Sequence, residues 1–108
     1  MMLRVSIRRV RAGQVEALRE WLAQLNHRRE EVVETFRQEG VRHEQAYLLD
    51  TGSGHVLVYA MELEDEERAR EAFAASTLPI DAEHRRVMDA AVGEPAGAEL
   101  LYDVRVDA

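Results

Sequence analysis

The sequence contains no cysteine among its 108 residues. A disulfide framework and a thiolate nucleophile are therefore excluded, and zinc would have to rely on histidines and carboxylates alone. Basic side chains are also in short supply, because 14 of them face 21 aspartates and glutamates, leaving a formal net charge of −7. Binding to nucleic acid or to an anionic membrane depends on Lys and Arg, so this balance argues against both partners.

Several recognisable sequence signals are missing as well. There is no Gly-rich phosphate loop, no Ser-centred nucleophile elbow and no paired catalytic motif. The start of the chain runs directly into an alternating segment that contains Arg8 and Arg9, so we find no apolar signal core and no membrane span. By default, these absences predict a soluble protein of the cytoplasm.

Two periodicities divide the chain into elements. Apolar residues alternate with polar ones from Leu3 to Val10, which is the period of a strand. From Val15 they recur at helical spacing as far as Gly40, which predicts one long helix with a glycine C-cap and a bend near Arg29. The remaining predicted elements are strands at 43–50 and 55–63 around the turn Thr51–Gly54, a helix opened by Glu64–Glu67, a helical stretch capped by Asp81, and a last strand at Leu100–Val106.

This order predicts an α+β fold, a ferredoxin-like split β-α-β-β-α-β domain over residues 1–108, with a four-stranded antiparallel sheet and the helices on one face. Alternation assigns one set of strand residues to the helices: Leu3, Val5, Ile7, Leu48, Leu57, Tyr59, Met61, Leu100, Tyr102 and Val104. The opposite face then mixes apolar and charged residues: Arg4, Ser6, Arg8, His43, Gln45, Tyr47, Leu49, Val56, Val58, Ala60, Glu62, Asp103 and Arg105. Such a face is too apolar for water and too charged for a sealed core, so we expect a second copy to cover it and to enclose a polar cavity.

Three segments carry a resemblance to the dimeric α/β-barrel superfamily, and within it to an uncharacterised bacterial family, over nearly the whole chain. They are His43–Asp50, Val58–Asp65 and Glu83–Asp89. The resemblance implies the ferredoxin-like fold and a homodimer. A more distant similarity is to the L-rhamnose mutarotases, through Tyr47–Asp50, Ala60–Glu62 and Ser76–Thr77. The functional residues of the mutarotases are not matched, because Trp21 and Leu25 occupy the positions of their Tyr and His, and His84 and Arg85 those of their tryptophan pair.

Histidine is the side chain that titrates nearest to neutral pH, so acid/base chemistry is expected from His43, on the cavity face, or His84, at the cavity mouth. His27 and His55 are expected at the surface. The predicted ligand-binding residues are Arg4, Arg8, Tyr47, Glu62 and Asp103. The two arginines suit an anionic or polyhydroxylated ligand, although internal ion pairs with Glu62 and Asp103 are favoured over this use. A metal site from His43, His84 and Glu62 lacks any spacing motif, so we expect no metal and no cofactor.

Three functions remain open. The first is binding of a small polar or anionic molecule between the sheet faces of a homodimer, with or without acid/base catalysis. The second is a non-catalytic structural or ligand-sensing dimer, and the third is a mutarotase-like sugar isomerase.

Overall fold

The computed structural model describes residues 1–106 and shows one antiparallel sheet of four strands in the order β2-β3-β1-β4. The last two residues of the predicted domain, 107 and 108, lie outside the described range. The strands are β1 (Met2–Val10), β2 (Val41–Asp50), β3 (His55–Leu63) and β4 (Val92–Ala96). The predicted four-stranded antiparallel sheet is confirmed, with β1 and β3 at its centre.

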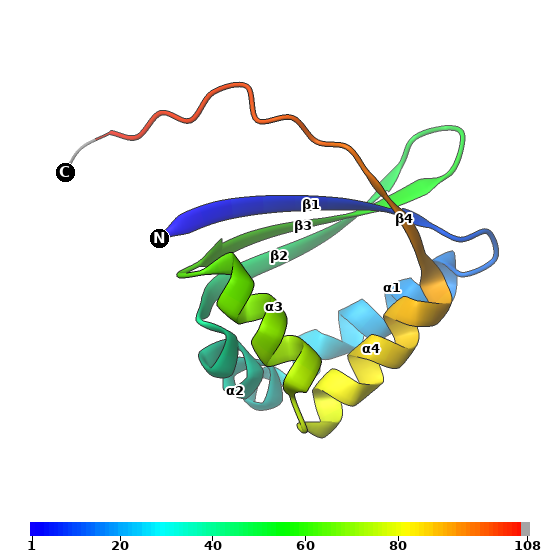
Figure 1. Cartoon of the computed structure of the whole chain (residues 1–108). Coiled ribbons are helices and arrows are strands. Elements are labelled where there is room, and N and C mark those ends of the chain that lie inside the picture. The colour runs from blue at the N-terminus through cyan, green and yellow to red at the C-terminus, as the bar shows by residue number, and fades with distance from the viewer. Residues whose placement is uncertain (107–108) are drawn as a thin grey trace.

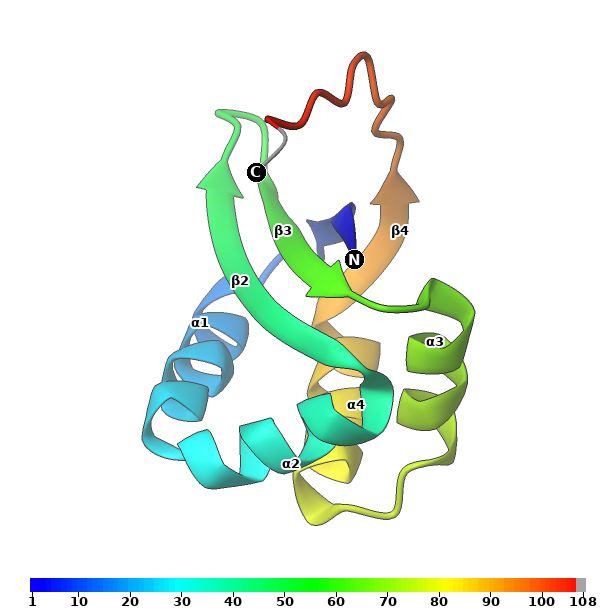
Figure 2. The same ribbon diagram turned by 90° about the vertical axis from the view of Figure 1, so that its left-hand side faces the viewer.

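The helices form a single layer on one face of this sheet, as predicted, while residues 97–106 run past the other face (Figure 1). They are α1 (Val15–Gln24), the short 3₁₀ turn η1 (Leu25–His27), α2 (Arg29–Glu39), α3 (Glu66–Ala75) and α4 (Pro79–Ala91). Seen after a quarter turn, α1 and α2 lie below β2, and α3 and α4 lie toward β4 (Figure 2).

The prediction of a single long helix between Val15 and Gly40 is wrong, because the chain leaves the helical conformation at η1 and Arg28. Arg28 has φ −123° and ψ 40°, outside the helical region. Its guanidinium donates to Glu31 at 2.7 Å and to Glu83 of α4 at 2.8 Å, which holds the chain where it turns into α2. Gly40 ends α2 with φ 74°, a left-handed conformation that glycine adopts at little cost, so the predicted glycine cap is confirmed.

The predicted hairpin is confirmed, with Gly52 and Gly54 at positive φ in the turn between β2 and β3. The sequence suggested that Asp81 caps α4, and this prediction is wrong. That helix begins at Pro79, which suits the first turn because it has no N–H to leave unpaired. The Asp81 carboxylate is buried instead, and it accepts hydrogen bonds from Thr35 Oγ1 at 2.6 Å and Ser76 Oγ at 2.5 Å, linking α4 to α2 and to the end of α3.

The last strand is also misplaced by the sequence pattern: it is β4 (Val92–Ala96), not Leu100–Val106. Gly93 and Pro95 make this segment resemble a loop. It pairs with β1 because its backbone is held there, with the Arg8 guanidinium donating twice to Gly93 O, at 3.0 and 2.7 Å. Leu100, Tyr102 and Val104, expected to face the helices, are about four-fifths exposed.

The strand register shows which side chains face the helices. Directly opposed residues of antiparallel strands point to the same side, and Leu57, opposite Arg8 and Leu48, packs into the core beneath the sheet. The predicted sides of β2 and β3 are therefore confirmed, but β1 is inverted. Arg4, Ser6 and Arg8 are on the helix side, and Leu3, Val5 and Ile7 are on the opposite face. We call that opposite face, formed by the odd-numbered residues Leu3–Arg9 of β1 and their partners in β3 and β2, the outer sheet face.

The core lies under the end of the sheet where β1 and β3 meet α1 and α4. Leu18 of α1 and Leu57 of β3 are fully buried, and Ala91 and Val92 pack against them at the α4–β4 junction. This cluster joins α1, α4 and β4 to the sheet, so its packing determines how these elements lie against β1 and β3.

We therefore expect Leu18→Ala to lower the free energy of unfolding by about 2–5 kcal/mol, because the substitution leaves a cavity in a close-packed region. The neighbouring Arg19→Ala, which removes an exposed side chain from the same helix, is expected to change it by less than about 0.5 kcal/mol. Urea unfolding followed by circular dichroism measures both values, and equal effects for the two variants would contradict this core.

Candidate functional site

A pocket of about 480 Å³ lies between the sheet and helices α2, α3 and α4. Its volume is within the range of small-molecule sites. Most of the wall is apolar, with Val32, Phe36, Met61, Phe73 and Ile80 among the contributors. The polar and charged residues that line it are Arg4, Ser6, Thr35, Glu39, Glu44, Tyr59, Glu66, Arg70, Asp81 and His84.

His84 of α4 is enclosed by aromatic side chains. Trp21 Nε1 donates a hydrogen bond to His84 Nδ1 at 2.8 Å, and the Tyr59 hydroxyl lies 3.2 Å from His84 Nε2. Phe73 packs edge-on against the imidazole, with ring centroids 5.7 Å apart. Burial lowers the pKa of His84, although the nearby Asp81 charge opposes the shift. The imidazole is therefore neutral at physiological pH.

This hydrogen-bonding pattern determines where the imidazole carries its proton. Because indole N–H can only donate, Nδ1 of His84 must accept and cannot hold the proton of the neutral ring. The proton is then on Nε2, from which it is donated to the oxygen of Tyr59. The Tyr59 hydroxyl proton is left to point elsewhere, with Met88 Sδ as a weak acceptor at 3.9 Å. Tyr59 can therefore donate a hydrogen bond to a molecule in the pocket.

Two carboxyl groups with raised pKa values line the same pocket. Burial raises the pKa of Glu44 on β2 to about 7, so this carboxyl exchanges its proton near neutral pH. Burial also raises the pKa of Glu39 at the end of α2 to about 8, with further contributions from the negative charges of Asp81 and Glu44. Glu39 is thus mostly protonated at pH 7. Burial raises the pKa of Tyr59 as well, so its hydroxyl stays neutral.

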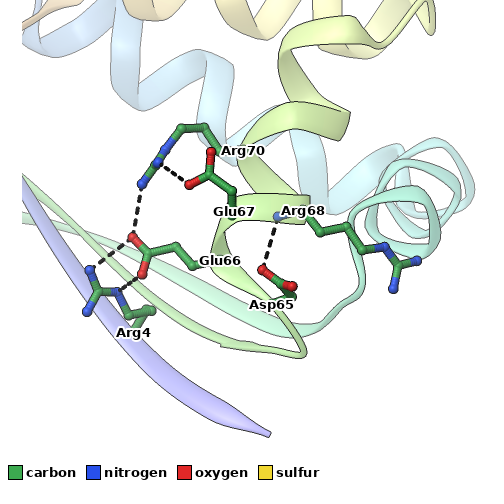
Figure 3. Close-up of polar contacts among 6 residues, drawn as sticks. All are labelled: Arg4, Asp65, Glu66, Glu67, Arg68 and Arg70. Carbon is green, nitrogen blue, oxygen red and sulfur yellow. Dashed lines mark hydrogen bonds and ion pairs between the residues drawn. The ribbon is translucent and has the colours of Figure 1, made fainter.

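Three charged residues of the pocket, Arg4, Glu66 and Arg70, meet at the end near β1 and α3. Arg4 reaches from β1 to Glu66, with 2.7 Å between Nε and Oε2, and Arg70 holds the same carboxylate at 3.1 Å (Figure 3). Asp65, which caps α3 by accepting from the Arg68 N–H at 3.2 Å, sets the start of the helix that carries Glu66. The charges of these arginines are thus already paired with carboxylates of the protein.

A second hollow opens along β2, between that strand and α1, η1 and α2. It shares five wall residues with the first pocket: Leu25, Val32, Phe36, Glu44 and Tyr59. Tyr47 and Gln45 line its outer part and are joined by a hydrogen bond of 2.7 Å. Glu44 and Tyr59 therefore lie at the boundary between the two hollows.

The structure separates the residues predicted for the site. His84 and Arg4 line the pocket, and Tyr47 lines the second hollow. His43 and Glu62 face each other on the outer sheet face, so they cannot share a metal ion with His84 beneath the sheet. The Arg8 guanidinium donates its hydrogen bonds to the Gly93 carbonyl, and Asp103 lies in the exposed residues 97–106. The predicted ion pairs of Arg4 and Arg8 with Glu62 and Asp103 are wrong, because Arg4 pairs with Glu66.

Sequence reasoning missed Glu39, Glu44 and Tyr59. Tyr59 was assigned to the helix side as a core residue, and nothing in the sequence placed a pocket there. The sequence did contain a signal for Glu44. Residues two apart on a strand face the same side, so Glu44 shares its side with Ala46 and with Leu48, which the alternation assigns to the helices.

The fold and the pocket define an α+β protein with a site between one sheet face and its own helices. The chain belongs to a family of unknown function, DUF6176, whose model matches residues 1–107. No curated protein and no solved structure matches the chain. Within residues 1–106, none of the helices is both long and apolar enough to cross a membrane.

The raised pKa of Glu44 predicts a particular dependence of stability on pH. The folded protein keeps this proton at pH values where the unfolded chain has lost it, so its contribution to stability declines as pH rises from about 4.5 to about 7. The glutamine of Glu44→Gln cannot titrate. We therefore expect the free energy of unfolding of this variant to rise by roughly 1–3 kcal/mol relative to that of the parent protein over this interval. Glu34→Gln, an exposed carboxylate of α2, should follow the parent curve. Unfolding in urea at pH 5, 6, 7 and 8 tests this, and parallel curves for all three proteins would contradict the assignment.

Proposed function

We propose that this protein binds a small, uncharged, partly apolar molecule in the pocket between the sheet and helices α2, α3 and α4, and that Glu44 and Tyr59 transfer or hold protons on it. The observation that carries the proposal is the convergence of Glu44, Tyr59 and His84 on one apolar pocket. Sites for small molecules combine such apolar walls with a few polar groups that orient the ligand.

The preference for an uncharged ligand follows from the charges of the wall. Glu39 and Glu44 can donate hydrogen bonds when protonated, but a ligand carboxylate would be repelled once Glu44 ionises. The pocket arginines, Arg4 and Arg70, are paired with Glu66 and Glu67. Hydroxyl and carbonyl groups on the ligand match the Tyr59 hydroxyl and the glutamic acid side chains without any charge being buried.

The reaction that suits this arrangement is an isomerisation by proton transfer. The Glu44 carboxylate accepts a proton from a ligand O–H or C–H, and the Tyr59 hydroxyl, supported by His84, stabilises the developing charge on a ligand oxygen. Glu44 then returns the proton to a different ligand atom, so the ligand is isomerised and the protein is unchanged. A group with a pKa near 7 suits this task, because it is available in both protonation states at neutral pH. Opening of a sugar ring, as in the mutarotases, belongs to this reaction class. In a non-catalytic binding protein, the same residues would only hold the ligand.

We further propose that the protein is a homodimer through its outer sheet faces, in a ferredoxin-like arrangement. Leu3, Val5, Tyr47 and Leu49 on this face are between 46% and 72% exposed in the single chain, which is more apolar surface than a sheet normally leaves in water. The strand order β2-β3-β1-β4 supports the ferredoxin-like topology. In this dimer the pockets of the two copies lie on the far sides of the paired sheets, not between them.

A thermal-shift screen with pairs of compounds that differ in charge tests the binding proposal. We expect 4-hydroxyacetophenone to raise the melting temperature more than 4-hydroxybenzoate, and D-galactose more than D-galactonate, because a ligand that binds only the folded state stabilises it. Tyr59→Phe should remove most of the stabilisation, while Tyr102→Phe, the same change at an exposed position, should retain it. Equal stabilisation by the charged compounds would refute the preference for neutral ligands.

Once a ligand is identified, Glu44→Gln separates catalysis from binding. If Glu44 moves a proton, we expect the variant to bind within a few fold of the parent affinity and to lose about 100-fold or more in turnover. A ligand that the parent protein leaves chemically unchanged, as followed by NMR, would support the non-catalytic alternative.

A further inference from the structure

The exposed apolar side chains are concentrated on one side of the molecule. In the described part of the chain, the large ones lie on the outer sheet face, at the start of the chain and in residues 97–106, which we call the exposed segment. The exposed segment contributes Leu100, Leu101, Tyr102, Val104 and Val106, at 79% to 97% exposure. This side of the sheet is the one that no helix covers (Figure 1).

The exposed segment has the sequence of a strand but no strand partner. Leu100, Tyr102, Val104 and Val106 alternate with other residues at the period of two that β-structure requires. Over residues 97–106, the hydrogen bonds of the structure include a single one to the rest of the chain, from Arg105 Nη2 to Met1 O at 2.6 Å. This contact holds the segment on the uncovered side of the sheet while its apolar side chains remain in solvent.

The sheet offers an open edge beside the uncovered face. β4 pairs with β1 at Ile7, Arg8 and Val10, so residues Met2–Ser6 of β1 keep their backbone groups free along the edge that faces β4. Unpaired edges of this kind accept strands from other chains. Ten extended residues span roughly 33 Å, whereas the five open residues of β1 span roughly 17 Å. About half of the exposed segment can therefore pair with this edge, and the other half is left to contact the rest of a second copy.

We propose that the exposed segment of one copy lies as a strand against the open part of β1 and the outer sheet face of a second copy, and that the second copy does the same in return. This inference rests on the homodimer proposed above and names the contact that closes it. A reciprocal exchange uses the same two surfaces twice and therefore closes at two copies.

The apolar surface involved is sufficient for a stable pair. Five side chains of the exposed segment and four of the outer sheet face are exposed in the single chain, nine in total per copy. At roughly 60–120 Å² for each side chain, they would bury on the order of 800 Å² per copy, which is the size of a standard stable interface. Without the exposed segment, more than half of these side chains are lost.

Sedimentation velocity on three forms of the chain tests the exchange. We expect the full chain to be a dimer at micromolar concentration, and both a chain ending at Ala98 and the Leu100→Asp/Tyr102→Asp/Val104→Asp variant to dissociate at least 100-fold more readily. The control Asp103→Ala/Arg105→Ala changes the alternate side of the segment and should stay within about fivefold of the parent. Because all these positions are exposed, far-UV circular dichroism should show each chain folded.

The lack of cysteine permits a second test by cross-linking, since every disulfide must then come from introduced residues. In the double variant Leu3→Cys/Tyr102→Cys, mild oxidation should give a covalent dimer on a non-reducing gel. Peptide mapping of a mixture of light and ¹⁵N-labelled protein should show that the disulfide joins position 3 of one copy to position 102 of the other. Arg19→Cys/Tyr102→Cys, with one position on the helix side, should stay uncross-linked.

The outcomes distinguish the two proposals. A full chain that sediments as a monomer overturns both the dimer and the exchange. A full-length dimer that persists unchanged in the chain ending at Ala98, or a disulfide formed within one copy, overturns the exchange and leaves the dimer in place.

Discussion

The contact of Leu57 with Leu18 is the constraint on which the rest of the structure depends. Side chains of a strand alternate between faces, so burying Leu57 under the helices also turns Tyr59 and Met61 toward them. Through the strand register, the same contact places Glu44 of β2 under the helices. A shift of one residue in this register would move the pocket's acid and hydroxyl to the opposite face.

The pocket keeps polar groups where a layer of apolar side chains would pack more simply. Burying Glu39 and Glu44 without cationic partners is unfavourable, and both respond by holding their protons more tightly. The Thr35–Asp81–Ser76 hydrogen bonds show the other solution, in which a buried carboxylate is fully satisfied and joins three helices. Asp81 has hydrogen-bond partners and supports the structure, whereas Glu39 and Glu44 lack cationic partners. Departures of this kind from good packing concentrate at functional positions, so we assign Glu39 and Glu44 to the site.

Periodicity predicted β2, β3, their turn and the helical layer correctly, because each of these elements follows its local pattern. It failed for β1, where the apolar set Leu3, Val5 and Ile7 faces away from the helices. Arg4 and Arg8 can lie on the helix side because Glu66 pairs with Arg4 and the Gly93 carbonyl accepts hydrogen bonds from Arg8, and neither partner is adjacent in sequence. β4 was missed for a related reason, since its pairing depends on long-range contacts that override a Gly- and Pro-containing sequence. The pocket could not be predicted, because its wall is formed by strands and helices that are distant in sequence and meet only in the fold.

The chain has a single tryptophan, and its indole is bonded directly to the imidazole that supports Tyr59. Imidazole quenches indole emission strongly when it carries a charge and weakly when it is neutral. The natural fluorescence of this protein is therefore an optical signal from a group one hydrogen bond behind the cavity wall. Arrival of a guest molecule, or a change in proton occupancy next to it, can be followed in real time without attaching a dye.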